Sequence, residues 1–262
     1  MPEGDTIHRT ATRLRAALLA RPLTRIEVPR AVGRLPPTGQ PVRAVDARGK
    51  HLLIHVDDLV IHTHLGMTGS WRIYRPGQRW TTSPRAARVV LGVEHAVAVC
   101  AASPVAEVLD AAGLARHPVL RRLGPDLCDP AADLDEAAAR LRRLSTPQRP
   151  IGEALLDQRA ACGIGNVYRC DVLFLHGIHP GEPVASLTDD ELRSLLEDSA
   201  RLLRTNLETS RRTTVPGAAA GALWVHGRRG RPCRRCSTPV ACAPLGEPAR
   251  HAYWCPGCQV RR

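Results

Sequence analysis

The spacing of hydrophobic residues changes from a helical to a strand pattern near residue 23. Residues 5–20 carry Ile7, Ala11, Leu14 and Leu18 at helical spacing, which predicts an amphipathic helix. From about 23 to 100, short β-type runs are separated by glycine, proline and aspartate, which predicts a series of strands. The clearest runs are His51–Val56, Leu59–Leu65, Trp71–Tyr74, Val89–Val93 and Ala96–Cys100.

The second half of the chain has a helical pattern. Residues 104–130 predict a helix followed by a linker, and residues 211–221 a basic, glycine- and alanine-rich loop. Thr188 and Glu191 form a capping-box pattern, which predicts a helix that runs to about Asn206. The other predicted helices are Leu134–Leu144, Ile151–Ala161 and Val167–His176.

Length and composition narrow the class of protein. A chain of 262 residues, 44% of them hydrophobic, has room for two domains and a small appendage. It has no apolar run long enough to span a membrane, and its acidic N-terminus does not resemble a signal peptide. We therefore expect a cytoplasmic protein whose nine cysteines are thiols or metal ligands.

The net charge of +12 is unevenly distributed. Residues 1–130 have 18 basic and 11 acidic groups (+7), residues 131–200 have 7 and 12 (−5), and residues 201–262 have 12 and 2 (+10). Such a basic tail indicates a polyanionic partner, with nucleic acid favoured over an anionic membrane because no basic amphipathic helix is present.

Lysine is almost absent. Of the 37 basic residues only Lys50 is a lysine. Arginine replaces lysine wherever a fixed positive charge is enough, but it cannot give up a proton. Lys50 therefore either survives by chance or serves a site that needs a compact ammonium group.

The strongest local motif is a pair of CxxC knuckles, Cys233/Cys236 and Cys255/Cys258, with 18 residues between them. Four thiolates at this spacing are typical of a closed, structural Zn²⁺ site, and redox chemistry is the alternative. Cys242, between the knuckles, is not required as a ligand. The loop that contains Arg250 would be presented by this zinc finger.

A glycine turn, Gly163-Ile164-Gly165-Asn166, precedes a predicted helix. Asn166 is suited to cap that helix, which would leave backbone N–H groups for a phosphate. An ordinary turn is the alternative. At the other end of the chain, removal of Met1 would give Pro2 a free secondary amine, next to the carboxyl of Glu3. Such an amine can act as a Schiff-base nucleophile, although proline at position 2 is common and usually without significance.

Several motifs occur in one order along nearly the whole chain: Pro2-Glu3-Gly4, residues 48–53 (RGKHLL), residues 64–69 (HLGMTG), residues 155–158 (LLDQ), residues 163–168 (GIGNVY), residues 177–180 (GIHP) and the cysteine ribbon. In this the chain resembles the Fpg/Nei family of DNA glycosylases. The resemblance implies an α+β multidomain fold with a two-layered β-sandwich and flanking helices, a helix-two-turn-helix domain and a C-terminal zinc finger. We expect these parts to span residues 1–113, 131–216 and 223–262, with a linker at 114–130.

The resemblance also implies roles for individual residues. Pro2 would be the nucleophile, Glu3 the general acid/base, and Lys50 a phosphate contact that assists proton transfer. Asn166, with Gly165, would bind phosphate, and Arg250 would hold the phosphates that flank the lesion. The implied reaction removes an oxidised base from a flipped nucleotide in double-stranded DNA and cuts the strand by β,δ-elimination, with one structural Zn²⁺ and a monomeric enzyme.

Departures from the family pattern concern substrate choice. Thr6 stands where the family usually has glutamate. Met67 resembles the void-filling methionine of the 8-oxoguanine branch, or it is an ordinary turn or core residue, and the Arg-Arg-Phe loop of that branch is absent. The PEGDT start resembles actinobacterial endonuclease-eight-like members, which favours oxidised pyrimidines.

Three other functions fit part of the sequence: an 8-oxoguanine/formamidopyrimidine glycosylase, a non-catalytic homologue that binds damaged or abasic DNA, and a zinc-ribbon RNA-binding protein. The remaining candidates are expected to be structural. His62 and His64 share a strand face as a metal pair would, but no third ligand is evident. Cys100, Cys128, Cys162 and Cys170 are expected to be buried thiols.

Overall fold

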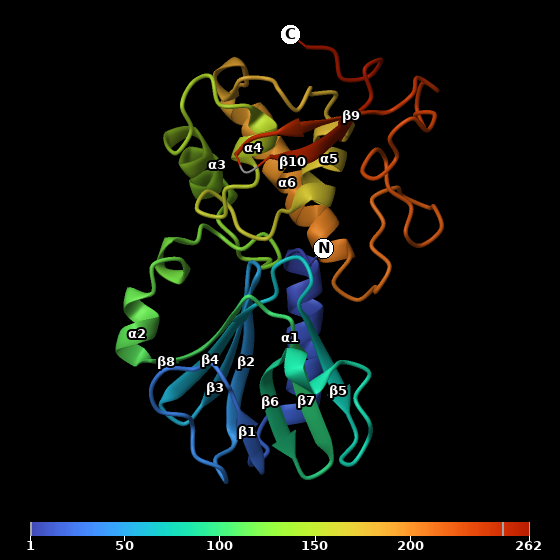
Figure 1. The fold of residues 1–262 in the computed structure, drawn as a ribbon. Coiled ribbons are helices and arrows are strands. Elements are labelled where there is room, and N and C mark those ends of the chain that lie inside the picture. Colours follow the sequence, from blue (N-terminus) through green and yellow to red (C-terminus); the bar gives the residue numbers. More distant parts are fainter. Residues whose placement is uncertain (1, 248, 262) are drawn as a thin grey trace. The chain divides into compact units, whose positions relative to one another are not determined.

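The computed structural model describes residues 2–247 and 249–261, and the chain divides into two compact units between Arg122 and Leu123 (Figure 1). Among the described residues, no helix is both long and apolar enough to cross a membrane. Each unit has its own hydrophobic core.

The N-terminal unit is a two-layered β-sandwich with helix α1 (Gly4–Leu18), as predicted (Figure 1). One sheet has the strand order β2-β3-β4-β8 and the other β1-β6-β7-β5, and all pairings are antiparallel. The strands are β1 (Arg25–Glu27), β2 (Val42–Arg48), β3 (His51–Val56), β4 (Leu59–His64), β5 (Ser70–Tyr74), β6 (Ala87–Val93), β7 (Ala96–Ala101) and β8 (Val105–Asp110), with a 3₁₀ turn η1 (Pro84–Ala86) before β6.

The two faces of the β2-β3-β4-β8 sheet differ in chemistry. Because side chains alternate along a strand, Leu52 and Ile54 of β3 and Ile61 of β4 point into the sandwich core, where they join Ile7 and Leu14 of α1. The opposite face carries polar residues: His51 pairs with His64, and His62 pairs with Glu107.

The segment 104–130 is different from its prediction. It opens with strand β8, and α2 (Ala111–Arg116) and a 3₁₀ turn η2 (Leu120–Arg122) follow. Every residue of Val105–Leu109 is only half-buried, because β8 is an edge strand that pairs with β4 alone. Its residues therefore do not alternate clearly between buried and exposed. Only its pairing with β4 identifies this segment as a strand.

The C-terminal unit packs four helices around an apolar core, and a hairpin of β9 (Ala241–Leu245) and β10 (Arg250–Trp254) follows. The helices are α3 (Leu134–Arg143), α4 (Ile151–Ala154), α5 (Asn166–Leu175) and α6 (Asp189–Thr205), with a 3₁₀ turn η3 (Val184–Ser186) before α6. The predicted capping box is present: the Glu191 N–H donates to Thr188 Oγ1 at 3.1 Å, and the Thr188 N–H donates to Glu191 Oε2 at 2.8 Å.

Helix α4 is much shorter than the predicted Ile151–Ala161. Side chains after Ala154 form local hydrogen bonds that compete with the helix. The Asp157 carboxylate accepts the Arg159 N–H at 3.1 Å, and Gln158 Nε2 donates to the carbonyls of Leu156 and Ile164 at 2.9 and 3.0 Å. Residues 155–161, which were predicted to be helical, thus form the turn that leads to α5.

Candidate active site and metal centre

The candidate nucleophile lies at the start of α1. Pro2 is partly exposed and Glu3 is fully buried at the helix N-cap, where its carbonyl accepts the N–H groups of Thr6 and Ile7 at 3.0 and 3.2 Å. The Glu3 carboxyl makes no cap hydrogen bond, so the helix holds the Glu3 backbone without using its acid group. The predicted removal of Met1 lies outside the described residues.

Thr6, in the first turn of α1, lies next to a buried carboxylate. Its hydroxyl donates to Asp5 Oδ1 at 3.4 Å, and Arg9 lies 4.0 Å from Asp5 Oδ2. Asp5 is fully buried near the helix N-terminus, where the helix dipole favours a negative charge. The family usually has a carboxylate at position 6. In this chain position 6 is Thr6, and a carboxylate lies directly beside it, on Asp5.

Lys50 occupies the tip of the β2–β3 hairpin. The turn contains only Gly49 and Lys50, and Gly49 has φ +58°, as the first position of a type II′ turn requires. Burial is the main cause that lowers the pKa of His51 to about 3, and the nearby Lys50 ammonium contributes. Burial and Lys50 also lower the pKa of His64. The only lysine of the chain thus lies beside two neutral histidines.

His62 and His64 do not form a metal pair with each other. His62 instead contacts Glu107 and His117, and the three ligand atoms lie within 4.8 Å of one another. No third ligand was evident in the sequence because Glu107 and His117 come from β8 and the segment after α2, which meet His62 only in the fold.

Met67 lies in the turn between β4 and β5 and is 75% exposed. The alternative that Met67 is a core residue is therefore wrong. An exposed, flexible thioether at a turn can contact a partner, and this role stays a prediction.

Asn166 is not the cap of α5. Gly165 takes the N-cap position without a side-chain hydrogen bond, and Asn166 is the first helical residue. Its side chain is 8% exposed, and Nδ2 donates to the His251 carbonyl of β10 at 2.9 Å. Asn166 thus connects α5 to the β9–β10 hairpin, and because this partner lies 85 positions away in the sequence, the local pattern did not reveal it.

The sequence pattern did not predict that two charged residues in α5 are buried. Arg169 is fully buried, bonds to Asn166 Oδ1, and donates to the carbonyls of Gly152 and His251, both at 3.1 Å. Asp171, also fully buried, accepts the hydroxyl of Thr214 and the N–H groups of Trp224, Val225 and His226 at 2.9–3.0 Å. The available signal was two charges inside the apolar run of residues 167–175.

Arg250 is exposed and is the first residue of β10, paired with Leu245 of β9. The expected loop between the knuckles is thus a β-hairpin. Its backbone is anchored from α5, since Arg169 also reaches the Arg250 carbonyl at 3.5 Å. The hairpin fixes the backbone of Arg250 and leaves its guanidinium at the surface.

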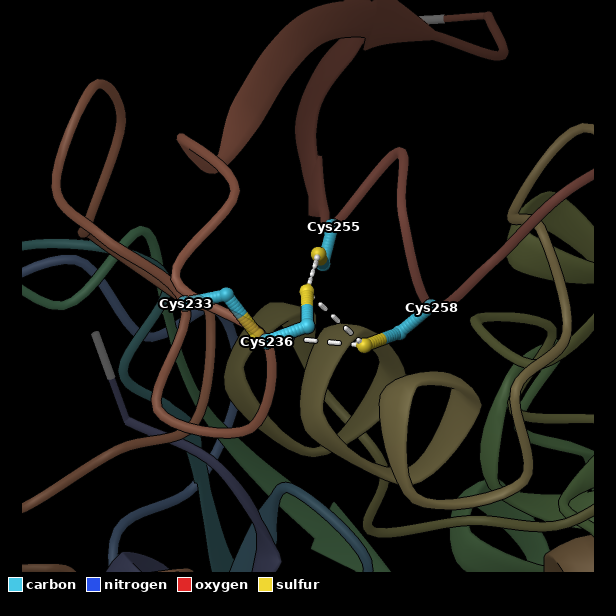
Figure 2. Close-up of side chains that lie close together, drawn as sticks. All are labelled: Cys233, Cys236, Cys255 and Cys258. Atoms are coloured by element: carbon cyan, nitrogen blue, oxygen red, sulfur yellow. Dashed lines mark hydrogen bonds between the residues drawn. The ribbon is translucent and has the colours of Figure 1, made fainter.

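The four predicted cysteines converge. Figure 2 shows Cys233 and Cys236 on the segment before β9, opposite Cys255 and Cys258, which follow β10. The sulfur–sulfur distances are 3.4 Å for Cys236–Cys255 and Cys236–Cys258, and 3.9 Å for Cys233–Cys258. A tetrahedral zinc site with bonds of about 2.3 Å needs sulfurs about 3.8 Å apart, so the four thiols fit Zn²⁺. Cys242 is outside this cluster.

The surroundings affect the cluster thiols differently: they favour the thiolate of Cys236, whereas burial is the main cause that raises the pKa of Cys255 and of Cys258. Hydrogen bonds with Thr238 are the main cause that lowers the pKa of Cys236 to about 6, and the Arg235 N–H donates to Cys233 Sγ at 3.3 Å. By contrast, Cys100, Cys128, Cys162 and Cys170 are buried thiols, as expected, and burial raises the pKa of Cys170 to about 11.

Comparison with protein families identifies two matching regions. Residues 1–104 match the formamidopyrimidine-DNA glycosylase N-terminal domain, and residues 123–216 match the formamidopyrimidine-DNA glycosylase H2TH domain. Among curated proteins, the chain is 44% identical to "Probable endonuclease 8 2" of Streptomyces coelicolor, over 99% of this chain and 94% of the relative. It is 40% identical to "DNA-(apurinic or apyrimidinic site) lyase Nei2" of Mycolicibacterium smegmatis, over 99% of both chains.

Among solved structures, the fold is similar to a point mutant of Lactococcus lactis Fpg in complex with DNA that contains Fapy-dG. The TM-score is 0.82 at 21% identity, with 99% of this chain and 100% of the other covered. A complex of Lactococcus lactis Fpg with abasic-site DNA gives a TM-score of 0.81 at 22% identity and the same coverage. The fold class inferred from the sequence is thereby confirmed.

Proposed function

The chain belongs to the Fpg/Nei family of DNA glycosylases, and on this premise we propose that it removes oxidised bases by means of a Pro2 Schiff base and then cuts the abasic strand. It is a DNA glycosylase and AP lyase of base excision repair. The observation that carries the mechanism is Pro2 directly before a buried Glu3 at the start of α1, in a chain that aligns end to end with an AP lyase.

The substrate is damaged double-stranded DNA. Structures of the same fold hold DNA with a Fapy-dG lesion or an abasic site, and residues 201–262 of this chain carry a net charge of +10. An enzyme that acts on a base within a duplex must first turn the nucleotide out of the stack. Basic groups supply the phosphate contacts that make this binding dependent on salt. We propose that the enzyme works as a monomer in the bacterial cytoplasm.

The proposed reaction starts when the neutral Pro2 amine attacks C1′ and the damaged base leaves with the electron pair of the glycosidic bond. Pro2 loses its N–H proton, the C1′–O4′ bond of the sugar ring breaks, and Glu3 protonates O4′, so that the Pro2 nitrogen forms an iminium with C1′. This iminium acidifies the C2′ proton. Loss of that proton expels the 3′ phosphate, and a second elimination expels the 5′ phosphate, so a one-nucleotide gap remains. Glu3 serves as the general acid/base next to the nucleophile.

Four further residues have proposed roles in DNA binding, one of them together with its neighbour. Lys50 contacts the phosphate near the lesion from its hairpin tip and assists proton transfer, and Met67 occupies the space that the flipped base leaves. Arg250 holds the flanking phosphates. Asn166 and Gly165 act at the start of α5, where backbone N–H groups favour a phosphate.

The four-cysteine cluster is proposed to bind one structural Zn²⁺. Cys233, Cys236, Cys255 and Cys258 would hold it, and the bound ion supplies folding energy to the segment around β9 and β10. Because all four positions are protein thiolates, the site has no open position for substrate. The finer division into parts at residues 1–113, 131–216 and 223–262, with a linker at 114–130, stays part of this proposal.

A borohydride trap on abasic duplex DNA tests the nucleophile. Wild-type protein is expected to form a covalent complex. Pro2→Gly should form less, because it keeps a terminal amine but loses the ring. Pro2→Gln should form none, since its larger side chain keeps Met1 in place; mass spectrometry checks the N-terminus. No complex with the wild type, or full yield with Pro2→Gln, would overturn the assignment and favour a non-catalytic homologue.

The preferred lesion is proposed to be an oxidised pyrimidine, because the start of the chain resembles the endonuclease-eight-like branch and the two relatives above carry endonuclease 8 or Nei2 names. Single-turnover excision is measured on 5-hydroxyuracil, thymine glycol, dihydrouracil and 8-oxoguanine, and strand cleavage is measured on a plain abasic site. Faster excision of 8-oxoguanine than of the three pyrimidines would favour the alternative, a formamidopyrimidine-type enzyme.

A further inference from the structure

A buried chain of polar side chains runs across the outer face of the β2-β3-β4-β8 sheet. His51 Nδ1 lies 2.9 Å from His62 Nε2, and His62 Nδ1 lies 2.7 Å from Glu107 Oε1. His117 Nε2 lies 2.9 Å from the same oxygen. His51 and His62 are 7% and 1% exposed. Buried polar groups need hydrogen-bond partners, and here the partners form one continuous chain from the Lys50 hairpin to Glu107.

The donor and acceptor roles follow from the two ends of the chain. His117 Nδ1 accepts the N–H groups of Val119 and Leu120 at 3.2 and 3.0 Å, so it carries no proton. The proton of His117 is therefore on Nε2, which donates to Glu107. Because a metal would need a lone pair on this nitrogen, the cluster of His62, Glu107 and His117 is a hydrogen-bonded network and not a metal site.

The direction continues through the two buried histidines. Glu107 accepts the His62 Nδ1–H, so a neutral His62 has a lone pair on Nε2 and accepts the His51 Nδ1–H. Burial is the main cause that lowers the pKa of His62, against the opposite effect of Glu107, and it lowers the pKa of His51 to about 3. Both rings are thus neutral near pH 7, and every donor in the chain points toward Glu107.

The other end of this hydrogen-bonded series is His51, which directly follows Lys50 in the sequence and is influenced by its positive charge. His51 Nε2 is left with a lone pair, and no hydrogen bond to it is found among the described residues. The charged or titratable groups around His51 are Lys50 in the turn, Arg48 opposite on β2, His62 and His64 on β4, and His117 after α2. His64 Nδ1 accepts the Gly66 N–H at 3.3 Å, so a neutral His64 has its proton on Nε2.

We propose that His51, His62 and Glu107 form a proton relay that serves Lys50. A proton from the Lys50 ammonium, or from a water beside it, bonds to His51 Nε2. The His51 Nδ1 proton then moves to His62 Nε2, and the His62 Nδ1 proton moves to Glu107. One proton thus leaves the hairpin and one carboxylic acid forms. The side chain of Glu107 is 37% exposed, so solvent can reach it, and the reverse sequence returns the proton.

The relay rests on the proposed function, in which Lys50 assists proton transfer. Lysine is an effective acid or base only if its proton can be exchanged quickly. His51 would provide this exchange, because it takes up the proton from Lys50 and passes a proton on to His62. His117 would act as a positioning residue, since it holds Glu107 through a fixed N–H. The relay therefore explains why a sheet face that could be apolar or solvated is polar and buried.

His62→Gln separates transfer from positioning. The glutamine amide can donate to Glu107 and accept from His51, as His62 does, but it does not pass a proton along. Glu107→Gln keeps an acceptor oxygen but cannot take up a proton. Exposed His95→Gln is the matched control. Single-turnover cleavage of an abasic duplex is measured from pH 5 to 8 together with DNA affinity, and circular dichroism checks folding.

The relay predicts that His62→Gln and Glu107→Gln cleave on the order of tenfold more slowly with unchanged DNA affinity. It also predicts that the fall in rate at acid pH becomes shallower in both variants, where only the part caused by protonation of the Pro2 amine remains, while His95→Gln behaves as wild type. A wild-type rate and pH profile in both variants would overturn the relay. A wild-type protein that forms no borohydride-trapped complex would instead overturn the proposed function.

Nitrogen chemical shifts of the histidine rings test the geometry without activity. The relay predicts a single proton on Nδ1 in His51 and His62, and it places the proton that His117 donates to Glu107 on Nε2. A proton on Nε2 of His62 would reverse the direction of the chain and overturn the proposal. Glu107→Gln provides the assignment, because it should shift the signals of His62 and His117 most.

Discussion

Both units bury polar side chains, but they use opposite chemistry. In the C-terminal unit, Arg169 and Asp171 are fully buried, and each bonds mainly to backbone groups of distant segments. On the outer face of the β2-β3-β4-β8 sheet in the N-terminal unit, the buried groups are neutral histidines that bond to each other and to Glu107. Arg169 and Asp171 hold the segments around the zinc finger in place through fixed hydrogen bonds, whereas the histidines can exchange protons. Burial alone thus does not tell a structural polar group from a reactive one, and the partners do.

The largest expected difference between the two units is their response to the loss of zinc. Structural Zn²⁺ sites contribute an apparent free energy of about 10–16 kcal/mol, far more than any single hydrogen bond. Chelation, or Cys255→Ser, is expected to unfold the segment 233–258 and reduce DNA cleavage by a factor on the order of a hundred or more. The N-terminal unit should stay folded. Metal analysis and hydrogen exchange resolved by peptide measure both effects.

The same experiment asks whether the buried charges hold the finger without metal. Cleavage that survives verified zinc loss would mean that Asn166 and Arg169 suffice to keep the β9–β10 hairpin in place. Cys242→Ser is the matched control, because this thiol lies between the knuckles but outside the cluster. It should leave zinc content unchanged.

Asp171→Asn is expected to lower the free energy of unfolding of the C-terminal unit by about 3 kcal/mol. The carboxylate accepts four donors, and an amide would place its own N–H groups against some of them. Asp198→Asn is the control, since its half-buried pairs with Arg201 and His176 remain within reach of solvent and should contribute less than about 1 kcal/mol. Urea unfolding measures both variants, and equal losses would contradict the assigned difference in burial.

Acid should destabilise the N-terminal unit through His51. The pKa of His51 is about 3 in the folded chain and near the ordinary value of 6.5 when unfolded, so below pH 6.5 the unfolded state binds the extra proton. Stability is therefore complete above pH 6.5 and falls toward pH 3, by up to about 1.4 kcal/mol per pH unit for this one group. Urea unfolding with pulsed hydrogen exchange at pH 7 and 4.5 resolves the two units.

His51→Gln sharpens this prediction, because it removes the titrating ring. The variant should be less stable than wild type at pH 7, but its N-terminal unit should lose less stability at pH 4.5. If the wild type and His51→Gln have the same pH dependence, the buried histidines do not couple to folding.

Features with a local cause were predictable from the sequence. The alternation of β3 predicted its bounds without error, and the capping box of α6 formed because Thr188 and Glu191 need only each other. The cysteine spacing also identified a cluster that the fold assembles. In these cases nearby residues contain all the information that the contact requires.

Features with distant partners were not predictable in the same way. Asn166 was predicted to be a helix cap from its local pattern alone. Its actual partner, the carbonyl of His251, lies on β10, far away in the sequence. The histidine network needs the pairing of β4 with β8 before Glu107 meets His62. Asp171 gave a signal, a charge in an apolar helix, but its donors lie 43 to 55 positions later in the chain. One sequence without its fold does not identify such partners.

The tight turn at Gly49 and Lys50 limits how this part of the protein can evolve. Because strand side chains alternate, inserting or deleting one residue in the turn would shift β3 by one position against β2. His51 would then point into the sandwich core and Leu52 out of it. One-residue changes in loop length, which surface hairpins usually tolerate, are therefore unfavourable in this hairpin. The length of the turn should accordingly be more constant than its composition among related chains.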